Sequence, residues 1–249
     1  MTGAKQILLA GFAALCMVLP ACRSTSESDS VEPPPLVDSN LPLTAASYTA
    51  EYTQDGALPF TCEVKLGTGG RIRRDYVWKD EKDTERKVSI MIDGDKAVKI
   101  EDGKSVSADE ADAAQARFFA GLVLNQDSVV SSARRNGTAG KRSSAEEEGI
   151  LPCNVYTIAL SGIPGMASCV VEADPKSNRW SKLKVRLADD SDVVFSSAFS
   201  EYKLESGVTY PSRIVSSTEN GAPVFCTIRD VKINPELPDE LFRLPDING

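Results

Sequence analysis

The chain has 249 residues, of which 41% are hydrophobic, and a formal net charge of −8. This acidic balance argues against nucleic acid as a partner, because nucleic-acid binding needs a basic surface. Histidine is absent, which removes the usual general base, the commonest metal ligand and the near-neutral pH switch. The composition therefore favours a protein that is not an enzyme and that needs no metal or cofactor.

The first element along the chain is an apolar run over 7–19, which follows Lys5 and leads into a Leu-Pro-Ala-Cys sequence ending at Cys22. A positive residue, a short apolar core and a small residue before the cleavage point are typical of a secretory signal. With cysteine next, the pattern resembles the bacterial lipobox, which implies cleavage before Cys22 and acylation of its thiol. An ordinary cleaved signal and an uncleaved anchor stay open as alternatives, although the run is short against the about 20 apolar residues that span a bilayer.

Residues 22–46 are rich in serine, proline and acidic residues. Such a segment buries too little apolar surface to offset the entropy of ordering it, so we interpret it as a disordered tether. The expected organisation is thus a lipoprotein signal peptide over 1–21, the tether over 22–46, and one folded domain over 47–249.

Alternating apolar and polar residues, separated by turns rich in glycine, asparagine and aspartate, predict many short antiparallel strands in the folded domain. Strands are expected over 71–79, around 88–92 and 98–100, and over 153–160, 167–173, 179–187, 192–204, 208–217 and 223–233. Over 71–79, Ile72, Tyr76 and Trp78 are expected on one face and the charged residues largely on the other. The fold class is mainly β, either a sandwich or a curved, partly closed barrel.

Two segments interrupt the strands. The residues from Ser107 to Glu110 resemble a capping box, and apolar residues at helical spacing after them predict a helix that ends near Asn125. A shorter turn of helix is expected over 238–242. Residues 131–149 predict a loop, whose basic residues we interpret as a solvated charge run, with a phosphate or an acidic partner as the alternative.

Four cysteines lie in the expected folded domain. In an oxidising compartment they suggest two disulfides, for which three connectivities exist. Cys153 and Cys169 flank a turn-like stretch, so we expect them to bridge facing strands of a hairpin, and Cys62 then pairs with Cys226 by elimination. Four free thiols are the alternative. A zinc site is not expected, because no two cysteines have the close spacing of a thiolate cage.

The C-terminal part carries three motifs in succession: Gly-Val-Thr-Tyr-Pro over 207–211, Asp-Val-Lys-Ile-Asn over 230–234 and Leu-Pro-Asp-Glu-Leu-Phe over 237–242. This succession resembles the end of the LolA/LolB group of periplasmic lipoprotein carriers. The resemblance implies a single curved antiparallel sheet, a half-open β-barrel covered by one or two α-helices, whose cavity holds acyl chains. It brings no catalytic residues. With the lipobox, the chain is similar to the anchored acceptor LolB rather than to the soluble carrier LolA.

From this resemblance we expect a monomeric periplasmic lipoprotein, attached to the outer membrane through Cys22, that binds acyl chains of a lipoprotein or lipid in an apolar groove and acts in lipoprotein sorting. An envelope-stress sensor or a structural lipoprotein that binds a partner protein is the alternative. An ordinary filled core is also an alternative to the groove. The candidate groove residues are Trp78, Ile90, Phe118, Phe119, Leu122, Phe195 and Phe199.

Overall fold

The computed structural model describes residues 43–108, 110–124, 126, 143–145, 153–160, 166–177, 179–187, 195–218 and 221–245. The expected signal peptide, Cys22 and most of the expected tether lie outside the described residues. Most of the expected loop over 131–149 lies outside them as well.

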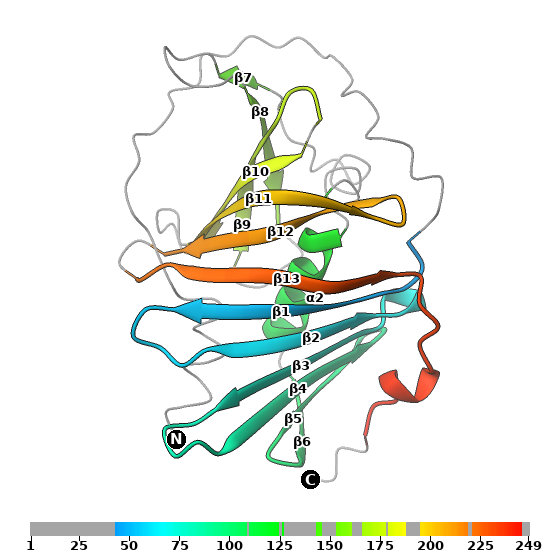
Figure 1. Ribbon diagram of the computed structural model, residues 1–249. Helices are drawn as coiled ribbons and strands as arrows, with labels where there is room; N and C mark the ends of the chain where they lie inside the picture. Colours follow the sequence, from blue (N-terminus) through cyan, green and yellow to red (C-terminus); the bar gives the residue numbers. More distant parts are fainter. Residues whose placement is uncertain are drawn as a thin grey trace. The chain divides into compact units, whose positions relative to one another are not determined.

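The described part of the chain forms one antiparallel sheet and one α-helix (Figure 1). The elements are β1 (Ala46–Gln54), β2 (Phe60–Leu66), η1 (Thr68–Gly70), β3 (Ile72–Lys79), β4 (Glu85–Asp93), β5 (Lys96–Glu101), β6 (Lys104–Ser107), α2 (Glu110–Leu124), β7 (Ser143–Ala145), β8 (Cys153–Ala159), β9 (Met166–Ala173), β10 (Trp180–Leu187), β11 (Phe195–Glu205), β12 (Val208–Ser217), β13 (Val224–Ile233) and η2 (Asp239–Phe242). The strand order is β6-β5-β4-β3-β2-β1-β13-β12-β11-β10-β9-β8-β7. The sheet is open, with β6 and β7 as its edges, so the predicted fold class is confirmed.

The strands that the sequence predicts are confirmed as β3–β5 and β8–β13. Four further strands had no separate prediction: β1, β2, β6 and β7. The last two are only four and three residues long, which is too short to show a period of two. β7 lies inside the segment that the sequence predicts to be a loop.

The predicted helix is confirmed as α2, but its predicted cap is wrong. Ser107 is the last residue of β6, where it pairs with Val98, and its hydroxyl donates to the carbonyl of Ala108 at 3.4 Å. The capping-box pattern assigns Ser107 to the start of the helix, but this residue is instead paired within the sheet. The buried side chains of α2 include Ala113, Ala116 and Ala120; these small residues allow a helix backbone to approach its neighbours closely.

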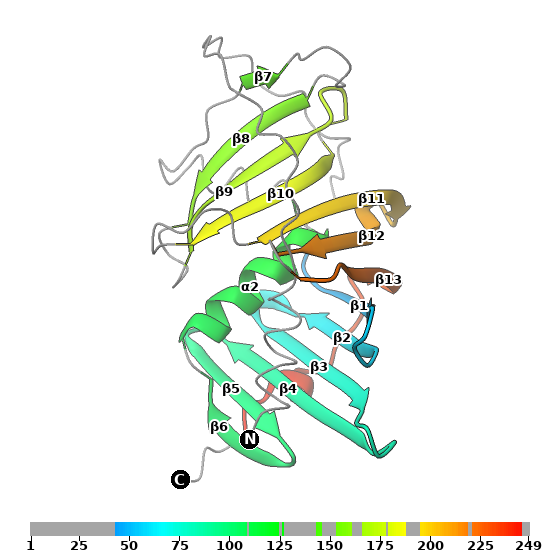
Figure 2. The ribbon, with the colours of Figure 1, turned by 90° about the vertical axis from the view of Figure 1, so that its left-hand side faces the viewer.

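Contacts between residues divide the chain into two compact units. The N-terminal unit contains Ser39–Leu124, Glu201–Arg213 and Phe225–Gly249. It therefore includes β1–β6, α2, the end of β11, the start of β12, most of β13 and η2. In this unit α2 lies across one face of the strands (Figures 1 and 2). The middle unit contains β7–β10 with the remaining parts of β11 and β12. Its buried residues include Trp180, whose ring meets Phe199 edge-on at 6.2 Å.

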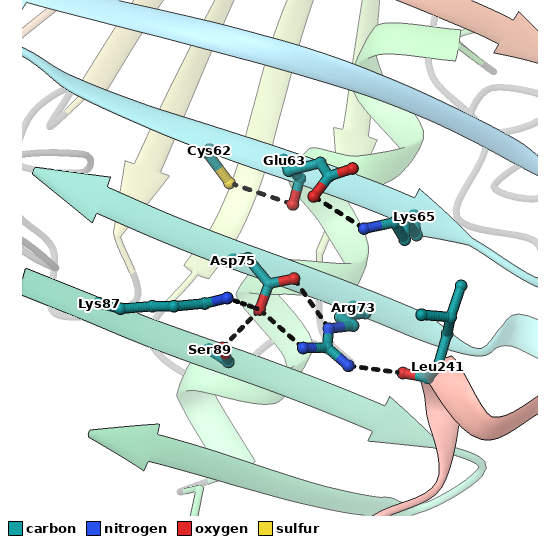
Figure 3. A network of polar contacts seen from close by, with 8 residues as sticks. All are labelled: Cys62, Glu63, Lys65, Arg73, Asp75, Lys87, Ser89 and Leu241. Atoms are coloured by element: carbon teal, nitrogen blue, oxygen red, sulfur yellow. Dashed lines mark hydrogen bonds and ion pairs between the residues drawn. The ribbon is translucent and has the colours of Figure 1, made fainter. Parts of the chain in front are cut away.

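A polar network on the face of β2–β4 opposite α2 holds the C-terminal segment (Figure 3). Arg73 Nε donates to Asp75 Oδ2 at 2.8 Å, and Arg73 Nη1 donates to the carbonyl of Leu241 at 3.1 Å. Ser89 Oγ also donates to Asp75, and Lys87 Nζ lies 3.8 Å from the same carboxylate. The helical turn predicted over 238–242 is confirmed as η2, and this network anchors it to β3.

Candidate functional site

The candidate site is the face of the N-terminal unit that α2 covers, which we call the inner face. Strand register places Tyr48, Val64, Arg74 and Ile90 side by side across β1, β2, β3 and β4. All four side chains are buried. Successive residues of a strand point to opposite faces, so the Asp75 network lies on the other side of the sheet, next to η2, with α2 behind the strands (Figure 3).

One end of the inner face is aromatic. Tyr52, Phe60 and Trp78 face one another across β1, β2 and β3, and Tyr76 lies two residues before Trp78 on β3. The rings of Tyr52 and Phe60 stack at 4.5 Å, and Phe60 lies 6.4 Å from Tyr76. Phe60 is buried, whereas Tyr52, Tyr76 and Trp78 are partly exposed. We call these four residues the aromatic edge; three of them are partly exposed to solvent.

The predicted groove residues fall in both units. Trp78 and Ile90 lie on the inner face, and Phe118 and Leu122 are buried in α2. In the middle unit two more are buried, Phe195 and Phe199. Phe119 is part of α2, but its side chain lies outside what the structure describes. The four residues in the N-terminal unit thus belong to the inner face or to the helix that covers it. A groove lined by any of the seven predicted residues stays a prediction.

Arg74 is the residue that the sequence analysis missed. The sequence predicts that the charged residues of this strand lie largely on the face opposite Trp78, yet Arg74 shares the inner face and is only 7% exposed. Its Nε has no hydrogen-bond partner, and it takes part in no ion pair between described residues. Its guanidinium lies 5.2 Å from the centre of the Tyr76 ring. The sequence did contain a signal for this position. Ile72, Arg74, Tyr76 and Trp78 are two residues apart, and residues at that spacing in a strand lie on the same face.

Burial and neighbouring polar groups together set the pKa values of the side chains on this face. Burial alone would lower the pKa of Arg74, but the groups around it, first Tyr76 and then Cys62, raise that pKa well above its ordinary value, so the guanidinium stays charged. Burial raises the pKa of Tyr48 and of Cys62, and it raises the pKa of Cys226 to about 12. Tyr48, Cys62 and Cys226 are therefore neutral near pH 7. A protonated thiol is a poor nucleophile.

Cys62, Cys169 and Cys226 are free thiols in the structure, and the sheet geometry argues against both predicted disulfides. Cys169 pairs with Ile158, five residues beyond Cys153 on β8, so the two cysteines point to opposite faces. Cys62 and Cys226 lie on β2 and β13 with β1 between them. Two strand spacings separate Cα atoms by about 9–10 Å, whereas a disulfide spans about 7 Å at most.

Metal ligation and membrane spanning concern the described ranges only. In these ranges, no three histidine, cysteine, aspartate or glutamate residues gather closely enough to hold a metal ion. None of the helices described there has the length and apolarity to cross a membrane.

Solved structures share this fold. A LolA superfamily protein from Nitrosomonas europaea matches with a TM-score of 0.55 and 12% identity, over 82% of this chain and 92% of that one. A putative outer membrane lipoprotein-sorting protein domain from Vibrio parahaemolyticus matches with a TM-score of 0.55 and 10% identity, over 81% and 90%. No protein-family model and no curated protein matches the sequence. At these identities the likeness shows the fold alone: the chain has a LolA-like fold.

Proposed function

We propose that this chain is a lipid-anchored protein of the bacterial cell envelope that binds acyl chains of a lipoprotein or a lipid against its inner face. The observation that supports the proposal is the inner face itself, an apolar sheet surface under a single helix, with the partly exposed aromatic edge as its approach. The shared fold with a LolA superfamily protein and with a lipoprotein-sorting domain agrees with it.

Burial of apolar surface is the whole mechanism in this proposal. Each CH₂ group moved from water to an apolar surface gains about 0.8 kcal/mol, so a long chain binds without any covalent chemistry. The neutral thiols of the inner face fit this binding role, and no catalytic step is proposed.

Release of the chain needs a competing apolar host and a cover that moves, and α2 is the proposed cover. Its N-terminal side is tied to β5, because Ala108 N donates to the carbonyl of Ala97 at 3.1 Å and Arg117 donates to the carbonyl of Gly94. Both contacts reach the β4–β5 hairpin. We therefore propose that α2 opens by pivoting about this attachment.

The anchor and the location belong to the same proposal. Acylation of Cys22 would hold the domain at the outer membrane, facing the periplasm, as a monomer. Intact mass of the protein extracted from membranes tests this, because an acylated N-terminal cysteine adds the mass of its acyl chains and Cys22→Ala loses it. A mature form of unmodified mass would contradict the anchor.

Binding is tested with the delipidated, soluble Cys22→Ala chain. We expect an acylated peptide to bind and the same peptide without its acyl group not to bind. Affinity should fall about fourfold for each CH₂ removed from the acyl chain. Trp78→Glu, on the aromatic edge, should weaken binding. Leu58→Glu is the matched control, because Leu58 is 51% exposed in the turn between β1 and β2. Equal binding of both peptides would contradict the proposal.

A further inference from the structure

We propose that Arg74 binds the anionic group of an acyl-chain ligand, so that the inner face prefers amphiphiles with a carboxylate or a phosphate over neutral ones. This inference rests on the proposed function, since it requires that acyl chains bind to the inner face. It adds the chemical class of the ligand, which neither the apolar surface nor the fold specifies.

The buried charge of Arg74 is costly. Other charged residues on this face are paired at its margins: Arg86 Nε lies 3.0 Å from Asp80 Oδ2, and Lys99 Nζ lies 3.0 Å from Glu101 Oε2. Arg74 is buried and has no carboxylate partner among the described residues. A buried guanidinium without an anion is costly, and an anion brought by a ligand would remove that cost.

The groups around the guanidinium suit an anion. Tyr48, Tyr52 and Tyr76 lie close enough to affect the electrostatics of Arg74. Burial raises the pKa of Tyr48 and of Tyr52, so their hydroxyls stay protonated and are able to donate hydrogen bonds. The nearest acidic residues in the strand sequences, Glu63 and Asp75, point to the opposite face. The surroundings of Arg74 thus offer donors to an oxyanion and no repelling carboxylate.

Arg74 lies next to a partly exposed ring and between apolar side chains. Tyr76, two residues from Arg74 on the same face, is partly exposed, and the centre of its ring lies 5.2 Å from the guanidinium. Val64 and Ile90, which flank Arg74 across the sheet, are apolar and suited to a hydrocarbon chain. The planar fork of arginine matches the oxygens of a carboxylate or phosphate. A fatty acid and a lysophospholipid both carry this combination.

The test compares three ligands with one acyl chain: palmitate, palmitoyl lysophosphatidic acid and methyl palmitate. They are titrated into the delipidated full chain carrying Cys22→Ala. We expect at least one anion to bind about 10- to 100-fold more tightly than the ester, the range of a hydrogen-bonded ion pair. Tighter binding of palmitate identifies a free carboxylate as the ligand group, and tighter binding of lysophosphatidic acid identifies a phosphate.

Three variants assign the preference to Arg74. Arg74→Met should bind the ester as before and lose the preference for anions, and Arg74→Lys should retain part of it. Arg229→Gln is the matched control, because Arg229 is exposed on β13 and paired with Glu51, and it should keep the full preference. Arg74→Met should also melt at a higher temperature than the parent without ligand, since it removes the unpaired charge.

Each result is decisive. Equal affinity of the parent for anions and ester overturns the inference, and so does a preference that survives in Arg74→Met. If Arg74→Met does not fold, Arg74→Lys decides: a reduced preference for anions with unchanged ester binding supports the inference, and an unchanged preference overturns it. Failure of all three ligands to bind the folded parent overturns the proposed function instead.

Discussion

Arg73 and Arg74 are neighbours in β3, yet their guanidinium groups lie on opposite faces of the sheet and meet opposite surroundings. Arg73 donates to Asp75 at 2.8 Å and to the carbonyl of Leu241. Arg74 lies among phenol and thiol groups and has no ion pair with any described residue. One arginine fastens the C-terminal segment to the sheet; the other is the proposed contact for a ligand.

The Asp75 network should stabilise the fold measurably. Asp75→Asn removes the carboxylate that Arg73 and Lys87 neutralise, while Asp75 itself is only 5% exposed. We expect a loss of about 2–3 kcal/mol in the free energy of unfolding, measured by urea denaturation. Asp83→Asn is the control, because its ion pair with Lys79 is exposed and contributes little. Equal losses in both variants would show that burial does not matter here.

The same network makes stability depend on pH. Burial alone would raise the pKa of Asp75, but hydrogen bonds from Arg73 and Ser89 and the charges of Arg73 and Lys87 hold it below its usual value. A lowered folded-state pKa gives stability above the unfolded-state value, and this stability is lost as the pH falls through the folded-state pKa. The melting temperature should therefore drop below about pH 4, and less steeply in Asp75→Asn. Parallel curves for the two proteins would contradict this.

Gly67 and Phe242 should be coupled by packing. A Cβ atom at Gly67 would lie 2.9 Å from Cζ of the Phe242 ring, which is 2% exposed. We expect Gly67→Ala to cost about 1–3 kcal/mol of unfolding free energy through this overlap. In a Phe242→Leu background the smaller side chain leaves room, so Gly67→Ala should cost less there. Additive losses in the double variant would show that the ring is not the obstacle.

The three buried cysteines should be unreactive in the folded protein and should react once it unfolds. Cys62, Cys169 and Cys226 are buried, and burial raises the pKa of Cys169 and Cys226 to about 12. We expect maleimide to label Cys153 first, because its side chain is partly exposed. After unfolding without reductant, peptide mass mapping should show labels at Cys62, Cys153, Cys169 and Cys226. A melting temperature that reductant lowers would reveal a disulfide and contradict the sheet geometry.

Several elements follow from local pattern and were predicted correctly. The strands β8–β13 and the hairpin of β4 and β5 show a period of two between turn residues, and α2 shows helical spacing. These signals depend only on residues near one another in the chain. The succession of motifs over 207–242 further indicated the LolA-like fold, which the solved structures confirm.

The pairing of distant strands was beyond the sequence. A shift of one residue in the register of two paired strands moves every side chain to the other face. Whether Cys153 lies near Cys169 therefore depends on the register of β8 and β9, which the sequence does not show. The insertion of β1 between β2 and β13 separates Cys62 from Cys226. The predicted disulfides disagree with the sheet for this reason.

The sequence by itself therefore determined the local elements, whereas export and acylation at Cys22 stay predictions. Only the tertiary structure decided that this face of β3 is covered around Arg74, so that its side chain is buried. The sequence makes Arg74 one of several surface charges, because charge favours solvent. Pairing of β3 between β2 and β4 holds it on the buried face, since the apolar residues Ile72, Tyr76 and Trp78 on the same side of the strand bring Arg74 with them.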